Sequence, residues 1–409
     1  MAGMGFSPLA NLKGRWLIFF RRRFLAGLPW YWPARPFGQP AMMAARRMVR
    51  SSFGSDHHVL LRILAKILVT LAWPAAVFVN LAEAHRVLSS RVISLRRAAG
   101  ALRAAIRHNI LPTEYFAYGL WRRECRKNID NYLYANEAAR IFKAINRPRV
   151  PDPIGDKLAF HAMCTAHGIP TPAVLAAFSP TGLLQDFSSG RPPQRHLFVK
   201  SASRGFHERL LCRGADFHSN RGYRIEAEGL ASYLADRARV ANLTLVVQPA
   251  LINHPNLKLE SCEALATVRL VTGRTIHGQV IPIFSYILFG LPHEITAHSN
   301  RVTLIDIATG RLLPPPRNNN PAGSMYDYRN LGDSCELAGW DAALRFVTVA
   351  HTSCSNVVYI GWDLAFTESG PVLLEGNANW NGATFQTLRD QPLGRTNFVD
   401  VLAQHVELK

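Results

Sequence analysis

Two carboxylates and one amide near the end of the chain are spaced so that a β-hairpin would bring them together. Two apolar runs in residues 359–377 flank Glu368-Ser369-Gly370, which predicts a hairpin with a three-residue loop and a glycine at its left-handed position. In that register Asp363 lies opposite Glu375. Asn377 follows two residues later, so it shares a face of the hairpin with Glu375.

The expected register also pairs Thr367 with Pro371 and Ala365 with Leu373. Two carboxylates directly opposite one another destabilise a sheet unless positive charge lies between them. A hard divalent cation prefers oxygen ligands, and Mg²⁺ carrying nucleotide phosphate is the common case. The sequence therefore predicts a Mg²⁺ site formed by the two carboxylates and the amide. The alternative is an exposed hairpin whose acidic side chains are only solvated.

Lys200 ends a short predicted strand, residues 196–200, and a loop of small residues follows it. An ammonium group at a strand end beside such a loop is suited to clamp phosphate, because loop N–H groups and the cation converge on one oxyanion. The loop has a single glycine, Gly205, so its serines or its arginine are alternative donors.

Arg269 lies between apolar neighbours in an alternating stretch, residues 267–271, which predicts a strand. A planar and permanently charged guanidinium inside a sheet requires an anion, and a phosphate or acyl phosphate would serve. The alternative is a structural ion pair with a carboxylate.

A helix is predicted directly after a proline-rich linker at residues 146–153, where three prolines exclude helix. Asp156 is a good N-cap residue for that helix, and Gly168 followed by Pro170 ends it. Lys157 then lies in the first helical turn, where an ordinary surface lysine is also common.

The composition describes an ordinary globular protein, 48% hydrophobic and 18% charged, and 409 residues suggest two or three domains. The net charge of +19 is uneven, because residues 1–110 contain 17 lysines and arginines against two acidic residues. The basicity therefore belongs to the N-terminal segment and argues against nucleic acid as a general partner. Six scattered cysteines without a C-x-x-C pair predict reduced thiols in a cytosolic compartment.

Aromatic residues alternate with arginines throughout residues 1–58. This mixture suits an anionic membrane surface, where rings lie at headgroup depth. It would also suit single-stranded nucleic acid or a basic face packed on its own domain. Residues 67–82 are the most apolar stretch and fall short of the ~20 residues needed to span a bilayer. A membrane-surface or buried helix is expected there, with a true span as the lesser alternative.

The hairpin motif Asp363…Glu375-Gly-Asn377 resembles the metal-binding end of ATP-grasp ligases. The segment D-K-L-x₉-G-I-P, residues 156–170, resembles the helix that opens the ATP-grasp domain of D-alanine–D-alanine ligases. Further segments, at residues 110–116, 248–255, 267–269 and 361–377, are similar to the sugar-transfer associated ATP-grasp family, which is related to alpha-L-glutamate ligases. This resemblance covers residues 60–390.

The resemblance implies roles for several residues. Lys157 and Lys200 would reach the nucleotide phosphates, and the adenine would lie against the hinge at Gln248–Leu251. There the carbonyl of Pro249 and the N–H of Leu251 would bond the base, and Gln248 would stand at a usually acidic position. Arg269 and Lys200 would be the catalytic residues, as cations that neutralise charge on the transferred phosphate and the acyl phosphate. ATP and Mg²⁺ are the implied cofactors, with Asp363, Glu375 and Asn377 as metal ligands.

The implied fold is α+β: two ATP-grasp subdomains that clasp ATP, preceded by a mostly helical, basic N-terminal region. We expect residues 1–110 as that region, 111–150 as further helices and a linker, 151–250 as the N-terminal ATP-grasp subdomain and 251–409 as the C-terminal subdomain with the metal site.

The implied activity is carboxylate–amine or carboxylate–hydroxyl ligation through an acyl phosphate, in assembly of a surface polysaccharide. The partners would be a small-molecule carboxylate, an amine or sugar acceptor, and an anionic membrane surface contacted by residues 1–110. The expected location is the cytoplasm or the cytoplasmic face of the membrane. The alternatives are a phosphotransferase of the same fold and a non-catalytic nucleotide-binding, membrane-associated protein.

Overall fold

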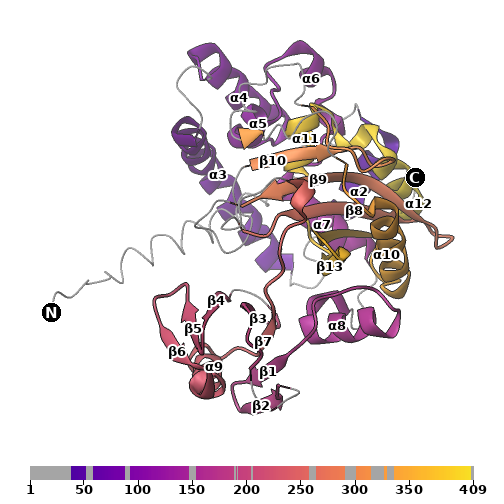
Figure 1. The fold of residues 1–409 in the computed structure, drawn as a ribbon. Helices are drawn as coiled ribbons and strands as arrows, with labels where there is room; N and C mark the ends of the chain where they lie inside the picture. Colours follow the sequence, from indigo (N-terminus) through magenta and orange to yellow (C-terminus); the bar gives the residue numbers. More distant parts are fainter. Residues whose placement is uncertain are drawn as a thin grey trace. The chain divides into compact units, whose positions relative to one another are not determined.

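The computed structural model describes residues 38–51, 59–87, 93–146, 153–187, 190, 192–203, 206–257, 264–290, 301–314, 327–328 and 336–406. These residues form two compact units (Figure 1). One is helical and contains residues 38–146 and 381–406. The other contains two β-sheets and is formed by residues 153–314, 327–328 and 336–380.

The helical unit is assembled from both ends of the chain. Its helices are α2 (Pro40–Ser51), α3 (Val59–Val87), α4 (Leu95–His108), α5 (Pro112–Ala117), α6 (Arg123–Lys127), α7 (Ala135–Ile145), α11 (Ala383–Arg389) and α12 (Asn397–His405). Helix α12 packs on α2. The side chain of Gln386 bonds both the N–H and the carbonyl of Leu133, and Arg122 is paired with Asp390. We expected residues 251–409 to form one subdomain; instead the last two helices complete the helical unit.

The predicted apolar stretch at residues 67–82 lies inside α3, which continues through Pro74. Among the helices of the described ranges, none combines the length and the apolarity that crossing a membrane requires. Helix α4 begins at Ser94, whose hydroxyl accepts the N–H of Arg97, and ends at Asn109 in the left-handed conformation.

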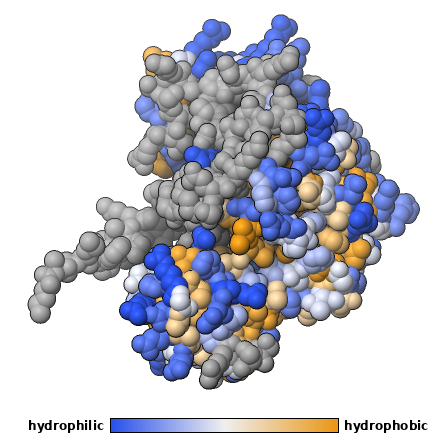
Figure 2. Space-filling view, in the orientation of Figure 1, coloured by the Kyte–Doolittle hydropathy of each residue, from blue (hydrophilic) through white to orange (hydrophobic). Residues whose placement is uncertain are grey.

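The first sheet of the other unit has seven strands and is antiparallel. Its order is β2 (Gly182–Gln185), β1 (Ala176–Ser179), β7 (Leu245–Pro249), β3 (Leu197–Ser201), β4 (His207–Arg213), β5 (Asp216–Ser219) and β6 (Arg224–Glu226). Helix α9 (Leu230–Ala241) covers one face with an apolar core. The outer surface over these strands and α9 is mostly hydrophilic with scattered apolar residues (Figure 2).

The second sheet has six strands. Its order is β11 (Asp327–Tyr328), β10 (Arg301–Ile305), β9 (Val280–Phe289), β8 (Thr267–Arg274), β12 (Tyr359–Thr367) and β13 (Gly370–Asn377), and only β10 and β11 pair in parallel. Helices α8 (Lys157–Ala166) and α10 (Trp340–Ser353) pack on it through one large apolar cluster. The two sheets are largely antiparallel, and helices pack against each of them, which confirms the expected α+β class.

Helix α8 begins as its sequence predicted. The Asp156 carboxylate accepts the N–H groups of Leu158 and Ala159 at 2.8 and 3.0 Å. The N–H of Lys157 donates to the carbonyl of Ala202 at 3.0 Å, which holds the start of the helix against the loop after β3. Gly168 has a φ of 64°, the left-handed conformation expected after the helix.

The hairpin of β12 and β13 corrects the predicted register near its turn. Thr367 pairs with Gly370 and Ala365 with Val372, so the predicted pairings of both residues were one position out. A β-bulge lies between Asp363 and Leu364, and Leu374 on the opposite strand is its extra residue. The bulge restores the pairing of Asp363 with Glu375. The prediction of that pair was therefore confirmed, although its turn was wrong.

Candidate functional site

The three predicted metal ligands come together on the hairpin. Asp363 pairs with Glu375 across the strands, and Asn377 lies at the end of β13. The Nδ2 of Asn377 is 3.4 Å from Oδ2 of Asp363 and 3.2 Å from Oε1 of Glu375. All three side chains therefore face one point.

Arg269 approaches this group from the neighbouring strand β8, where it lies directly opposite Asp363. Its Nε and Nη2 donate to the two oxygens of the Asp363 carboxylate at 2.6 and 3.1 Å. Burial lowers the pKa of Arg269, but the charge of Asp363, the hydrogen bond to it and the nearby Tyr286 and Glu375 together raise the pKa overall. The structure therefore shows the ion pair with a carboxylate that was predicted as the alternative, and binding of a phosphate or acyl phosphate by Arg269 stays a prediction.

Two glycines of the hairpin allow this close packing. A Cβ atom on Gly361 would lie 2.9 Å from Cβ of Trp380 and 3.2 Å from Nη1 of Arg269. A Cβ atom on Gly376 would lie 2.8 Å from the ring of Trp362. Both glycines are therefore required by close approach of neighbouring groups.

A buried polar chain, which the sequence did not reveal, fixes Trp362 beside Asp363. The Nε1–H of Trp362 donates to the hydroxyl of Thr272 at 2.8 Å, and that hydroxyl is 2.7 Å from Nδ1 of His351. The Nε2 of His351 is 2.9 Å from the carbonyl of Val357. Since a carbonyl only accepts, Nε2 carries the proton and Nδ1 accepts from Thr272. Burial lowers the pKa of His351 to about 4, so its ring is neutral.

Two lysines face the carboxylates, Lys157 from helix α8 and Lys200 from the seven-stranded sheet. Nζ of Lys157, in the first turn of α8, is 3.7 Å from Oε2 of Glu375 and donates to the carbonyl of Ser203 at 3.2 Å. Lys200 is buried on β3. Burial lowers the pKa of Lys200 to about 8, with Lys157 adding to the fall and Glu375 opposing it.

Three further residues line the same cavity and were not among the predicted ones. On adjacent strands, Phe198 pairs with Arg209 and Lys200 pairs with His207, so all four share one face of the sheet. The rings of Phe198 and His207 stack with centroids 5.9 Å apart. The alternation of residues 207–210 was the available signal, because buried Glu208 and Leu210 leave His207 and Arg209 on the opposite face.

The predicted adenine hinge lines this cavity as well. Gln248 lies opposite Phe198, and its Nε2 donates to the carbonyl of Pro172 at 3.0 Å. Pro249 ends β7, and Leu251 follows it in the connection to the second sheet. Downstream, Asn253 bonds the carbonyl of Ala264 and the N–H of Ala266. Its side chain is thus used to hold the connection together.

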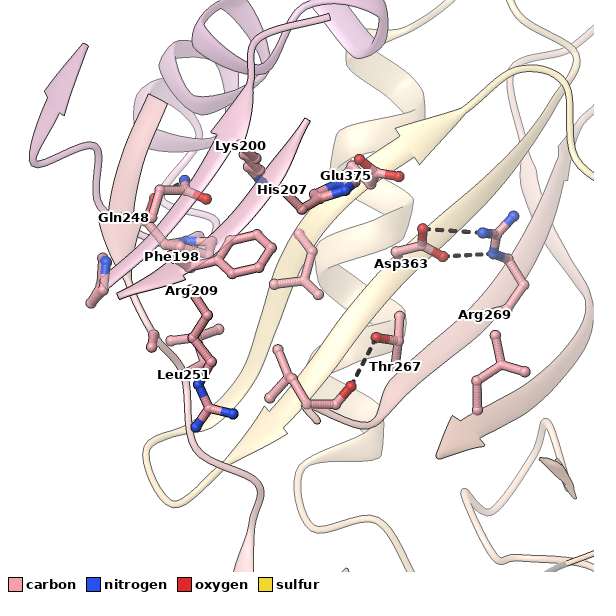
Figure 3. Close-up of a pocket in the computed structure, with 16 residues that line it drawn as sticks. Phe198, Lys200, His207, Arg209, Gln248, Leu251, Thr267, Arg269, Asp363 and Glu375 are labelled. Carbon is pink, nitrogen blue, oxygen red and sulfur yellow. Dashed lines mark hydrogen bonds and ion pairs between the residues drawn. The ribbon is translucent and has the colours of Figure 1, made fainter. Parts of the chain in front are cut away.

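The cavity itself has a volume of about 240 Å³. Figure 3 shows Phe198, Lys200 and His207 on strands of the seven-stranded sheet, with Asp363 and Arg269 on strands of the six-stranded one. The remaining lining residues are Pro172, Arg209, Gln248, Pro249, Ala250, Leu251, Leu265, Thr267, Leu288, Leu374 and Glu375. An apolar compartment at the hinge therefore leads to a charged end. Arg204 and Gly205 of the loop after Lys200 lie outside the described residues.

The charged end fits a divalent cation. Burial and the neighbouring Glu375 carboxylate raise the pKa of Asp363, although Arg269 opposes the rise. Burial would also raise the pKa of Glu375, but Lys157, the Asn377 amide and Lys200 lower it overall. Two carboxylates are ligands that a hard cation prefers, and the Asn377 amide, whose Nδ2 faces them in this structure, would add its oxygen after rotation of the amide group.

Two sheets of one unit, with Lys200 on one and the carboxylates on the other around a shared cavity, are the arrangement of an ATP-grasp protein. The chain belongs to the sugar-transfer associated ATP-grasp family, whose model matches residues 136–398. That match spans α7 to α12 and contains every predicted site residue. It confirms the resemblance inferred from the hairpin and helix motifs.

Similar solved structures include the L-amino acid ligase from Bacillus licheniformis, at 12% identity and a TM-score of 0.36 over 66% of this chain and 54% of that one. The D-alanine–D-alanine ligase from Bacillus anthracis complexed with ATP has 10% identity and a TM-score of 0.35 over 62% and 65%. N5-carboxyaminoimidazole synthetase from Staphylococcus aureus has 9% identity and a TM-score of 0.36 over 62% of this chain and 53% of that one. The chain thus spans between half and two thirds of these structures. No curated protein matches it in sequence.

Proposed function

We propose that this protein is an ATP- and Mg²⁺-dependent ligase that joins a carboxylate to an amine or a hydroxyl group. The observation that carries the proposal is the 3.7 Å approach of the Lys157 ammonium to the Glu375 carboxylate at one end of the cavity. Nucleotide phosphate needs both cations for its own charge and carboxylates for its metal ion. If the adenine of ATP lies at the hinge, its triphosphate extends to the end of the cavity where the Lys157 ammonium and the Glu375 carboxylate lie.

Each residue has a physical task in this proposal. The hinge backbone at Pro249 and Leu251 bonds the adenine, beside Gln248, and Phe198 supplies an apolar wall. Lys157 and Lys200 neutralise phosphate charge as the γ-phosphoryl group leaves ADP. Lys200 is well suited to this task, because a buried ammonium with little competing solvent interacts strongly with an anion.

Asp363, Glu375 and Asn377 would hold Mg²⁺. When bound, the metal supplies charge neutralisation at the phosphate oxygens. Arg269 keeps its guanidinium at the edge of this ligand set through its pair with Asp363. It is thereby positioned to bind the negatively charged acyl phosphate, because a planar guanidinium donates two parallel hydrogen bonds to such an anion.

The reaction follows two substitutions. A substrate carboxylate oxygen attacks the γ-phosphorus, the bond to the β–γ bridging oxygen breaks, and ADP leaves with that electron pair. The acceptor nitrogen or hydroxyl oxygen then attacks the acyl carbon, phosphate leaves, and the acceptor loses a proton. The protein contributes orientation and charge stabilisation in both steps.

The family description supports an acceptor that belongs to sugar transfer. We infer that the product is a sugar or surface polysaccharide precursor carrying an amino acid or a similar acid. ATP consumption supports a cytoplasmic location. The basic N-terminal region supports peripheral attachment to the cytoplasmic face of the membrane, with its acceptor on a lipid carrier.

The test is ADP formation with a panel of acids and amines, followed by identification of the product. Asp363→Asn and Glu375→Gln are expected to abolish Mg²⁺-dependent ATP consumption. Glu368→Gln, in the turn of the same hairpin and exposed, is the matched control and should behave like the unaltered protein. Unchanged turnover in the first two variants would refute the metal site. A stable phosphorylated product in place of an amide or ester would instead identify a phosphotransferase.

A further inference from the structure

Helix α3 exposes an apolar stripe along most of its length. Its members are spaced by three, four or seven residues and therefore lie on one side of the helix. They are all exposed: Leu60, Ile63, Leu64, Ile67, Leu71 and Phe78. From first to last this α3 stripe measures about 27 Å, at 1.5 Å per residue. Continuous exposed apolar surface of this extent marks a site of contact with another body.

Over residues 77–84, the side of α3 opposite the stripe is buried in the protein. Val77 and Ala84 are buried, and Ala84 belongs to the core shared with α4 and α5. The buried Asn80 accepts both the N–H and the hydroxyl of Thr113 at 2.9 and 3.0 Å, which ties α3 to the start of α5. In that part of α3 the stripe side is therefore the side that faces away from the core.

Helix α4 adds exposed cations near the C-terminal end of α3. It packs beside α3 and buries Ala101 and Ala104 in the same core. Its outward side presents exposed Leu95 and Ile106, and the arginines adjoin them. These exposed arginines form what we call the α4 basic edge: Arg96, Arg103 and Arg107. Exposed apolar residues together with arginines on one helix are the pattern of a helix that lies in the plane of an anionic lipid surface.

We propose that the α3 stripe and the α4 basic edge form one docking surface for an anionic phospholipid bilayer. The stripe enters the acyl boundary of one leaflet, and the arginines contact lipid phosphates. Charge selects this occupant over a second copy of the chain. A symmetric pairing through α3 would bring two basic regions together, and residues 1–110 carry 17 basic against two acidic residues in each copy. An anionic lipid bilayer can accept the apolar α3 stripe in its acyl region and bind the α4 basic edge through its phosphates.

The inference rests on the membrane attachment proposed above and assigns it to particular elements. It is independent of the ligase chemistry, because the site residues all belong to the two-sheet unit while α3 and α4 belong to the helical one. The two proposals can therefore fail separately.

The experiment is sedimentation of the full chain with vesicles of phosphatidylcholine alone or mixed with phosphatidylglycerol. Leu71→Glu should weaken binding to mixed vesicles at least tenfold, because removing one large apolar side chain from lipid contact changes a binding constant by about one to two decades. Its control is Val240→Glu on α9, since Leu71 and Val240 are exposed to the same extent, 73% and 76%. The control is expected to bind like the unaltered protein.

A second pair of variants tests the charge. Arg103→Gln with Arg107→Gln should weaken binding to mixed vesicles by about fivefold per arginine and reduce its dependence on salt. Arg345→Gln on α10, also exposed, is the control and should leave binding unchanged. Binding to phosphatidylcholine alone should be weak for every variant.

Equal binding by Leu71→Glu and Val240→Glu would overturn the proposal, as would equal binding to the two kinds of vesicle. So would a change in the molar mass of the free protein on Leu71→Glu with vesicle binding intact, because a second copy would then cover the stripe. Leu71→Gln replaces Leu71→Glu if circular dichroism shows that the latter does not fold. ADP formation with free substrates should be the same in all these variants, so that loss of vesicle binding is read separately from loss of ligase activity.

Discussion

The neutral, buried ring of His351 makes the stability of the two-sheet unit depend on pH in a defined direction. Its pKa is lowered to about 4 in the folded protein, and burial is the main cause. In the unfolded chain the pKa of a histidine is about 6.5. Between these values the unfolded chain binds more protons, so protonation favours unfolding. This contribution to stability is complete above about pH 6.5 and is lost as the pH falls towards about 4.

The size of the effect follows from the two pKa values. At about pH 5 the unfolded ring is almost fully protonated and the folded ring is mostly neutral, which lowers the free energy of unfolding by about 2 kcal/mol relative to neutral pH. Asp363 acts in the opposite direction, because its raised pKa lets the folded state bind protons that the unfolded state has released. The unaltered protein alone would therefore show a smaller net change.

His351→Gln isolates the histidine. The glutamine amide can accept from Thr272 and donate to the carbonyl of Val357, but it does not titrate. Urea unfolding of both proteins, followed by the fluorescence of the two-sheet unit at about pH 7.5 and about pH 5, should show the unaltered protein losing about 2 kcal/mol more than the variant. Parallel loss in the two proteins would refute the neutral ring and the hydrogen-bond chain assigned to it.

Two further substitutions test the packing behind the metal ligands. Thr272→Val removes the hydroxyl between Trp362 and His351, so it should lower the free energy of unfolding by about 2–4 kcal/mol because two buried polar groups lose their partner; a thermal melt equal to that of the unaltered protein would contradict the network. Gly361→Ala places a Cβ atom 3.2 Å from Nη1 of Arg269 and should weaken Mg²⁺-dependent ATP consumption while costing about 1–3 kcal/mol of stability; full activity with an unchanged melting temperature would show that this approach is not required.

The sequence was sufficient to predict structural features that depend on a local pattern of residues. The N-cap at Asp156 and the left-handed Gly168 follow from short-range rules. The predicted pairing of Asp363 with Glu375 is correct because a bulge compensates for the wrong turn. The turn of that hairpin did not follow from short-range rules. A bulge at Leu374 shifts the register by one residue, and a bulge is set by how both strands pack rather than by the turn alone.

Features that depend on residues distant in the sequence could not be predicted from the sequence. The role of Thr272 requires β8, β12 and α10 to be placed first, since its partners are 79 and 90 residues away. His207 and Arg209 become site residues only once β4 is known to pair with β3 in that register. Their alternation with buried neighbours was visible, but nothing in it specified which strand lies alongside.

The helical unit is joined by contacts between segments that are far apart in the chain, such as Arg122 with Asp390, 268 residues apart. On the ribosome, the helices before residue 147 emerge long before α11 and α12. The surfaces of these helices that later contact α11 and α12 therefore remain exposed while the whole two-sheet unit is translated. The two-sheet unit has its own uninterrupted cores and can form first. Assembly of the protein therefore ends with its last helices returning to close a unit that its first helices began.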